Sequence, residues 1–319
     1  MPPLWMMNYI LMVLVAIRRT IARTRIFLGW AKEKYGTLEP FVYKGFLFSP
    51  IIHTMERLKA CEKYNKFRPG DIMVSTYPKA GTNFVLDVIV SIYKEKGLLP
   101  KDKISMELVA QLELQFLALV SGSTSEEEAL NWIEDYPDPR IVKTHLPWNM
   151  FPADALEGKV KVIHCYRNPK DVCSSMFAFY KRVAVIFPST TWSQFVQWFI
   201  EGNVVGGSYF QFLKTWYPYR NNPGVLNLRF EDMKQDLKGN VIKITEFLDL
   251  ELSPQQIDAV VVANTFANKK KEMGSHNPIY RRGKSGGWKS DLTVDQNEMM
   301  DEWIQQEMEG LEGVKIAYD

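Results

Sequence analysis

The sequence has few cysteines and histidines, and neither type is grouped as a metal site would require. Three cysteines occur (Cys61, Cys165 and Cys173), no Cys-x-x-Cys pair is present, and the four histidines are scattered. An odd number of unclustered cysteines indicates free thiols in a reducing compartment, which favours a cytoplasmic location. Because zinc sites need clustered His and Cys ligands, we expect no metal.

The chain also lacks a hydrophobic run long enough to be a clear transmembrane helix. Residues 4–17 are apolar apart from Asn8, a stretch shorter than the roughly 20 residues that span a bilayer. No positive charge precedes it, as a signal peptide would require, whereas several arginines follow within residues 18–25. Residues 1–36 are therefore a leader. It could contact a membrane through residues 4–25, span it with the rest of the chain facing the cytosol, or pack on the protein.

Neither sign of charge is in large excess. Lys and Arg number 39 against 37 Asp and Glu, which argues against the broad basic face that nucleic-acid binding needs. The chain is 46% hydrophobic and 24% charged, as folded globular proteins are, and no repeat or low-complexity run follows residue 36. We expect one globular domain over residues 37–319, with anion binding confined to local sites.

Short β-rich runs alternate with helical patterns after the leader. Strands are expected at residues 71–77, 140–143, 160–166 and 225–230, and helices at 83–96, 169–180, 241–248 and from Ser253-Pro254 onward. This alternation predicts an α/β fold in which helices flank a central parallel sheet. Ligands of such sheets lie at the carboxyl ends of the strands, where three candidate motifs fall.

The turn Pro78-Lys79-Ala80-Gly81-Thr82 joins an expected strand to an expected helix. Helix starts present unpaired N–H groups and partial positive charge, so they bind phosphate. Gly81 would let the backbone approach closely, while Lys79 adds a charge and Thr82 a hydroxyl. Taken alone, the pattern also suits an ordinary strand–helix turn. Gly-x-x-x-x-Gly-Lys-Ser/Thr is absent, so this is a P-loop-like site and not a Walker A loop.

Four segments carry the strongest signal when they are taken together. They are residues 77–83 (Tyr-Pro-Lys-Ala-Gly-Thr-Asn), 143–147 (Lys-Thr-His-Leu-Pro), 167–175 (beginning Arg-Asn-Pro-Lys-Asp-Val) and 281–289 (Arg-Arg-Gly-Lys-Ser-Gly-Gly-Trp-Lys). In order and spacing they resemble the 5′-phosphosulfate loop, the catalytic segment, the 3′-phosphate segment and the carboxyl-terminal nucleotide loop of the cytosolic sulfotransferases. The resemblance implies transfer of a sulfuryl group from 3′-phosphoadenosine 5′-phosphosulfate (PAPS) to a hydroxyl or amine of a small lipophilic acceptor.

The resemblance also implies catalytic roles for three residues. His145 would be the general base, since an imidazole titrates near neutral pH. Lys79 would stabilise the leaving phosphate, and Lys143 would contact the transferring sulfuryl group. Without the resemblance, each could be an ordinary structural histidine or a surface lysine. The remaining histidines, which lack such neighbours, are expected to be structural: His53, His164 and His276.

A donor-binding set follows from the same resemblance. Arg167 and Ser175 would hold the 3′-phosphate, because guanidinium groups match phosphate in a bidentate fork. Phe84 and Phe230 stand where the family usually has Trp and Tyr, so aromatic area and one hydroxyl are lost; Ala80 and Asn83 similarly replace a usual Ser and Thr. The full implied set is Lys79, Ala80, Gly81, Thr82, Asn83, Phe84, Arg167, Ser175, Phe230, Thr265, Arg281, Arg282 and Gly283.

Residues 289–298 fit the family's short dimerisation pattern, Lys-x-x-x-Thr-Val-x-x-x-Glu, and so imply a homodimer. The same residues could simply cap a helix that starts near Val294.

Two other functions stay open at this point. An ATP-dependent small-molecule kinase would need a Walker A loop and an acidic magnesium ligand, and neither is visible. A catalytically silent, membrane-attached nucleotide-binding protein would have no use for Lys79, Lys143 and His145.

Overall fold

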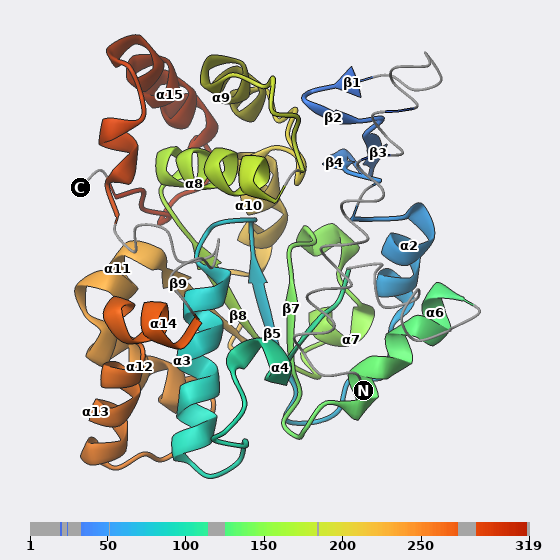
Figure 1. Ribbon diagram of the computed structural model, residues 1–319. Coiled ribbons are helices and arrows are strands. Elements are labelled where there is room, and N and C mark those ends of the chain that lie inside the picture. The colour runs from blue at the N-terminus through green and yellow to red at the C-terminus, as the bar shows by residue number, and fades with distance from the viewer. Residues whose placement is uncertain are drawn as a thin grey trace.

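A five-stranded parallel sheet forms the centre of the molecule (Figure 1). The structure, a computed structural model, describes Thr20, Thr24 and residues 33–50, 52–113, 125–183, 185–273 and 285–317. The sheet has the strand order β6-β7-β5-β8-β9, and every neighbouring pair is parallel. Its strands are β5 (Ile72–Thr76), β6 (Val109–Gln111), β7 (Ile141–Thr144), β8 (Lys161–Tyr166) and β9 (Val225–Arg229). The predicted α/β fold with a central parallel sheet is confirmed.

Strand β5 lies at the point where the strand order reverses. The next two strands along the chain lie on one side of it, and the last two lie on the other. All five residues of β5 are buried, as expected for a strand covered on both faces. At such a reversal the connections on the two sides diverge and leave room for a ligand beyond the carboxyl end of the strand.

Helices cover both faces of the sheet. Ile72 and Val74 of β5 belong to an apolar core shared with α3 (Thr82–Glu95), α12 (Leu237–Phe247) and α13 (Pro254–Ala263). Met73, which points to the opposite face, belongs to a second core shared with α8 (Pro169–Arg182), α9 (Trp192–Ile200) and α10 (Tyr209–Trp216). Figure 1 shows these two groups of helices in different parts of the molecule.

Shorter elements complete the fold. They are the strands β1 (Glu33–Lys34), β2 (Thr37–Leu38), β3 (Phe41–Tyr43) and β4 (Phe46–Phe48), and the helices α2 (Met55–Lys63), α4 (Ser105–Leu108), α6 (Glu126–Ala129), α7 (Ala153–Leu156), α11 (Phe230–Gln235), α14 (Phe266–Met273) and α15 (Val294–Glu307), with 3₁₀ turns at Leu130–Asp135, Trp148–Met150, Tyr217–Tyr219 and Gly287–Ser290. The three cysteines are buried free thiols, as predicted.

The antiparallel hairpin β1–β2 crosses the predicted boundary between the leader and the domain. Phe187 N donates to the Gly36 carbonyl at 2.7 Å, which ties the turn of this hairpin to the segment before α9. The boundary at residue 36 stays a prediction. Within the described ranges no helix is long and apolar enough to cross a membrane. Nearly all of residues 4–25, which the membrane prediction concerns, lies outside those ranges.

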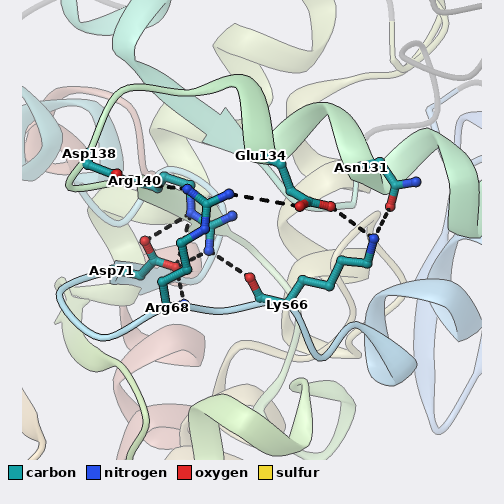
Figure 2. Close-up of polar contacts among 7 residues, drawn as sticks. All are labelled: Lys66, Arg68, Asp71, Asn131, Glu134, Asp138 and Arg140. Carbon is teal, nitrogen blue, oxygen red and sulfur yellow. Dashed lines mark hydrogen bonds and ion pairs between the residues drawn. The ribbon is translucent and has the colours of Figure 1, made fainter.

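A buried ion pair joins the amino-terminal ends of β5 and β7 (Figure 2). Asp71 directly precedes β5, Arg140 directly precedes β7, and both side chains are almost fully buried. Arg140 Nε donates to both carboxylate oxygens of Asp71, at 2.9 and 3.1 Å, and Arg140 Nη2 donates to the Lys66 carbonyl at 2.7 Å. The pair fixes this end of the sheet and leaves the carboxyl ends for the site.

Candidate donor and catalytic site

The loop between β5 and α3 has a backbone that only particular residues tolerate. Lys79 has φ 70° and Gly81 has φ 112°, both left-handed, and Ala80 N donates to the Tyr77 carbonyl at 3.0 Å. A Cβ on Gly81 would lie 2.6 Å from the Phe230 ring, so both the conformation and the space require glycine. The loop delivers the chain into the first turn of α3, where unpaired N–H groups make an anion site.

The surroundings of Ala80 suit an alanine at a position where the resembling family usually has a serine. The Ala80 side chain is fully buried and belongs to an apolar core, while the Ala80 carbonyl accepts a hydrogen bond from Cys165 Sγ at 3.4 Å. Thr82 begins α3, and its hydroxyl lies 2.5 Å from that of Thr76. Phosphate recognition at this loop would therefore rest mainly on backbone N–H groups.

Lys79 lies between this loop and α8. Its ammonium is 3.8 Å from the centroid of the Phe179 ring, a cation–π contact. Arg167, which follows β8, donates through Nη1 to the Lys79 carbonyl at 3.5 Å. The two segments predicted to bind the two phosphates are therefore adjacent, as expected from neighbouring parallel strands.

His145 follows the last residue of β7, and the structure fixes its ring. Nδ1 is 2.9 Å from the Thr76 carbonyl oxygen. Because a carbonyl can only accept, Nδ1 carries the proton and Nε2 keeps its lone pair. Burial lowers the pKa of His145 below its usual 6.5, although the charge of Glu113 and the bond to Thr76 act in the opposite direction. A neutral imidazole with an unprotonated Nε2 is the form that a general base needs.

Lys143 lies near the end of β7, two residues before His145. Burial lowers the pKa of Lys143, and the charges of Glu113 and Asp87 oppose that effect. Lys143 also adds a positive charge that lowers the pKa of His145. The charges of the two predicted catalytic residues therefore influence each other.

Glu113 is a member of this site that the sequence analysis missed. It follows β6 and is only 1% exposed, and its Oε1 accepts a hydrogen bond from His145 N at 3.0 Å. Strand β6 has only three residues and was not predicted, so the sequence held no clear signal that Glu113 lies beside the catalytic segment.

Arg167 lies among the residues predicted to bind the 3′-phosphate and the adenine. Its Nη2 is 3.5 Å from Asp171 Oδ2, and its guanidinium carbon is 4.2 Å from the centroid of the Phe230 ring. Ser175, half-buried, lies further along the same helix α8. Asn168 caps this helix, accepting from Lys170 N at 2.8 Å. Arg167 therefore lies just before α8 and Ser175 in its second turn, both near the positive end of this helix.

The two phenylalanines predicted to contact adenine meet edge to face. The Phe84 and Phe230 centroids are 6.0 Å apart with an interplanar angle of 71°. Lys234 Nζ is 4.6 Å from the Phe84 centroid, and burial together with the charge of Arg167 lowers the pKa of Lys234. Thr265 lies just after α13, is exposed, and donates its hydroxyl hydrogen to the Val262 carbonyl at 3.1 Å. Asn83 lies in the first turn of α3.

The predicted carboxyl-terminal loop is described only in part. Arg281, Arg282 and Gly283 lie outside the described residues. The segment that follows is held by Asp171, which accepts from Gly286 N at 2.9 Å and from Trp288 N at 3.2 Å. Since Asp171 also contacts Arg167, this segment reaches the predicted 3′-phosphate site.

No set of three or more His, Cys, Asp or Glu side chains is arranged to hold a metal in the part of the chain that the structure describes. His164 is fully buried and stacks on Trp216, with ring centroids 4.4 Å apart, and burial lowers its pKa to about 3. His53 is also buried, with a pKa lowered by burial to about 4, but the charges of Glu113 and His145 both act on it. His53 therefore belongs to the surroundings of the predicted base.

Comparison with known proteins identifies the family. The model of the sulfotransferase domain matches residues 69–312. An amine sulfotransferase of Oryctolagus cuniculus is 34% identical over 284 residues, which cover 83% of this chain and 89% of that protein. Sulfotransferase 1A1 of Rattus norvegicus is 35% identical over 247 residues, which cover 73% of this chain and 82% of that protein.

Solved structures agree with this result. The crystal structure of mouse sulfotransferase SULT7A1 complexed with PAP matches with a TM-score of 0.70 and 26% identity, covering 85% of this chain and 95% of that chain. A retinol dehydratase, solved with retinol and PAP, shares the fold with a TM-score of 0.72 at 22% identity, covering 86% of this chain and 90% of that chain. The sulfotransferase family and the enzyme class predicted from the four segments are confirmed, and the chain belongs to the family of PAPS-dependent sulfotransferases.

Proposed function

We propose that this enzyme transfers the sulfuryl group of PAPS to a hydroxyl or amine of a small lipophilic acceptor, with His145 as the general base. The observation that carries the proposal is the fixed ring of His145. Its Nδ1 is bound to the Thr76 carbonyl at the end of β5, which would leave Nε2 as the basic atom. The loop proposed to bind the donor follows the same strand end, which supports the proposal.

The transfer would proceed in line. The acceptor oxygen attacks sulfur while Nε2 of His145 takes the acceptor's proton. The bond between sulfur and the bridging phosphate oxygen breaks, and its electron pair stays on that oxygen. The products are the sulfated acceptor, 3′-phosphoadenosine 5′-phosphate (PAP) and an imidazolium, which later releases its proton to solvent. As in phosphoryl transfer, the protein's main tasks are positioning and charge stabilisation.

The cations of the site suit the two ends of the donor. Lys79 would leave the Phe179 ring to meet the leaving phosphate oxygen, and Lys143 would contact the sulfuryl oxygens. At the other end, Arg167 and Ser175 would bind the 3′-phosphate, with Arg281, Arg282 and Gly283 closing over it. Phe84 and Phe230 would hold the adenine ring, with Thr265 beside it.

The acceptor class rests on relatives as well as on the chemistry. The rabbit relative is an amine sulfotransferase, and a neutral Nε2 could accept a proton from an alcohol, a phenol, a sterol hydroxyl or an ammonium group.

We also propose that the chain forms a homodimer through residues 289–298 and that its catalytic domain lies in the cytosol. Contact of residues 4–25 with a membrane is tested by comparing vesicle binding of the full chain and of a chain lacking residues 1–30.

The test of the function is turnover of labelled PAPS with a panel of phenol, alcohol, sterol and amine acceptors. We expect sulfated product from at least one class, with and without a chelator of divalent ions. His145→Ala should lower the rate by about 10²–10⁴-fold, the usual contribution of a general base, while its affinity for PAP stays unchanged. Full activity of this variant would overturn the assignment of His145.

A further inference from the structure

The buried carboxylate of Glu113 accepts hydrogen bonds at one of its two oxygens. Its Oε1 accepts from His145 N at 3.0 Å and from Gln111 Nε2 at 3.3 Å. Its Oε2 is buried and has no hydrogen-bond partner among the described residues. A carboxylate that is 1% exposed is costly to keep ionised unless positive or proton-donating groups face it.

Three basic side chains from two parts of the chain interact electrostatically with this carboxylate. They are Lys143 and His145 at the end of β7, and His53 in the turn before α2. The charge of Glu113 also raises the pKa of the Cys61 thiol of α2. Glu113 raises the pKa of each of the three bases, against the lowering effect of burial. Its negative charge therefore acts on both predicted catalytic residues of the segment at the end of β7.

We propose that Glu113 is a positioning residue for sulfuryl transfer: it holds the His145 backbone at the end of β7 and stabilises the imidazolium that forms there. This inference rests on the proposed role of His145. The proton moves from the acceptor to Nε2 of His145 and goes no further while the S–O bond breaks. Glu113 has no part in the proton transfer itself. Its charge lowers the energy of the state in which His145 is positive and so favours the transition state.

A purely structural role would need only the hydrogen bond to His145 N. Glu113→Gln separates the two roles, because its amide oxygen can still accept from that N–H while the charge is gone. Single-turnover rates with PAPS and an uncharged alcohol acceptor would be measured across pH. We expect the rate to fall by about tenfold, because the imidazolium would lose a nearby negative charge. The affinity for PAP should not change, because the donor loops are untouched.

The pH profile is a second measurement, because a loss of packing alone would not shift the pH at which activity is lost. Glu113 raises the pKa of His145, so its neutralisation should move the acid limb of the profile to lower pH. Asp154→Asn is a matched control, since Asp154 is 4% exposed and bonds Lys159 Nζ at 2.5 Å, in α7 and away from the catalytic segment. Its acid limb should stay at the wild-type position.

The double variant separates this inference from the proposed function. If Glu113 acts through His145, adding Glu113→Gln to His145→Ala should change the rate less than twofold, because the two effects are not independent. If His145→Ala is fully active, the proposed base is wrong and the inference fails with it. If His145→Ala is impaired but Glu113→Gln keeps the wild-type rate and acid limb, or adds its full effect in the double variant, only the inference fails.

Discussion

The tautomer that the proposed general base needs is set at Nδ1 of His145, by Thr76. The Thr76 carbonyl ends the central strand, and it accepts the Nδ1 proton at 2.9 Å. The position of Nε2 is therefore set by a residue of the central sheet. Burial then lowers the pKa of the ring, so that the base stays neutral at pH values where an exposed histidine would begin to protonate.

This environment predicts the pH dependence of the reaction. A base must be neutral, so activity is lost as pH falls through its pKa, and a lowered pKa moves that loss below pH 6.5. We expect kcat/KM with an alcohol acceptor, which does not titrate in this range, to be constant near neutral pH and to fall only below 6.5. The limb should be absent from the residual activity of His145→Ala. An acid limb at or above the usual histidine pKa would contradict the assignment.

At the scale of elements, the longer strands were predictable from the sequence because each is a short run rich in apolar and β-branched residues. Strands β5, β7, β8 and β9 lie within two residues of their predicted ends, and Ser253 caps α13 by accepting from Gln256 N at 3.3 Å. The sequence also predicted that the motifs lie at carboxyl ends of strands. It did not predict which strands are neighbours, because pairing such as β5 with β8 joins residues far apart in the chain.

Strand β6 shows why the rest of the site was missed. It has three residues, and among the described strands only β7 pairs with it, so its pattern is too short to show a period. Its pairing with β7 carries Glu113 to the catalytic segment, a contact that only the tertiary structure creates. The predicted residues Arg281, Arg282 and Gly283 lie outside the described residues, and their role stays a prediction.

The pair of Asp71 and Arg140 at the opposite end of the sheet predicts a stability effect. Asp71→Asn removes the only acid that Arg140 contacts within 4 Å among the described residues, leaving a buried charge uncompensated (Figure 2). Breaking such a pair should lower the free energy of unfolding by about 3–5 kcal/mol, measured by urea denaturation. Asp138→Asn is the control, because Asp138 is 73% exposed and its pair with Arg68 should contribute at most about 1 kcal/mol. Equal, small losses in both variants would refute this account of the pair.

At the scale of the whole molecule, the first turn of α8 joins the donor site to the carboxyl-terminal helix. Lys170 is fully buried, and its ammonium donates to Asn297 Oδ1 and Asp301 Oδ1 of α15, both at 2.6 Å. The adjacent Asp171 holds the segment before α15 and contacts Arg167. The proposed dimer segment is therefore tied through two consecutive residues to the proposed 3′-phosphate site.

An exposed apolar residue in this segment offers a test of the proposed dimer. Val294, at the start of α15, is 71% exposed, and in a two-fold dimer the same patch of each subunit meets its copy. Val294→Glu should bring like charges together and give a monomer near 37 kDa in sedimentation equilibrium, where the wild type gives twice that mass. Val262→Glu is a matched control, because Val262 is 59% exposed on α13 and outside the segment, so this variant should stay dimeric. A monomeric wild type, or a Val294→Glu variant that stays dimeric, would show that Thr293 and its neighbours serve only to start the helix, with Thr293 accepting from Gln296 N at 3.3 Å.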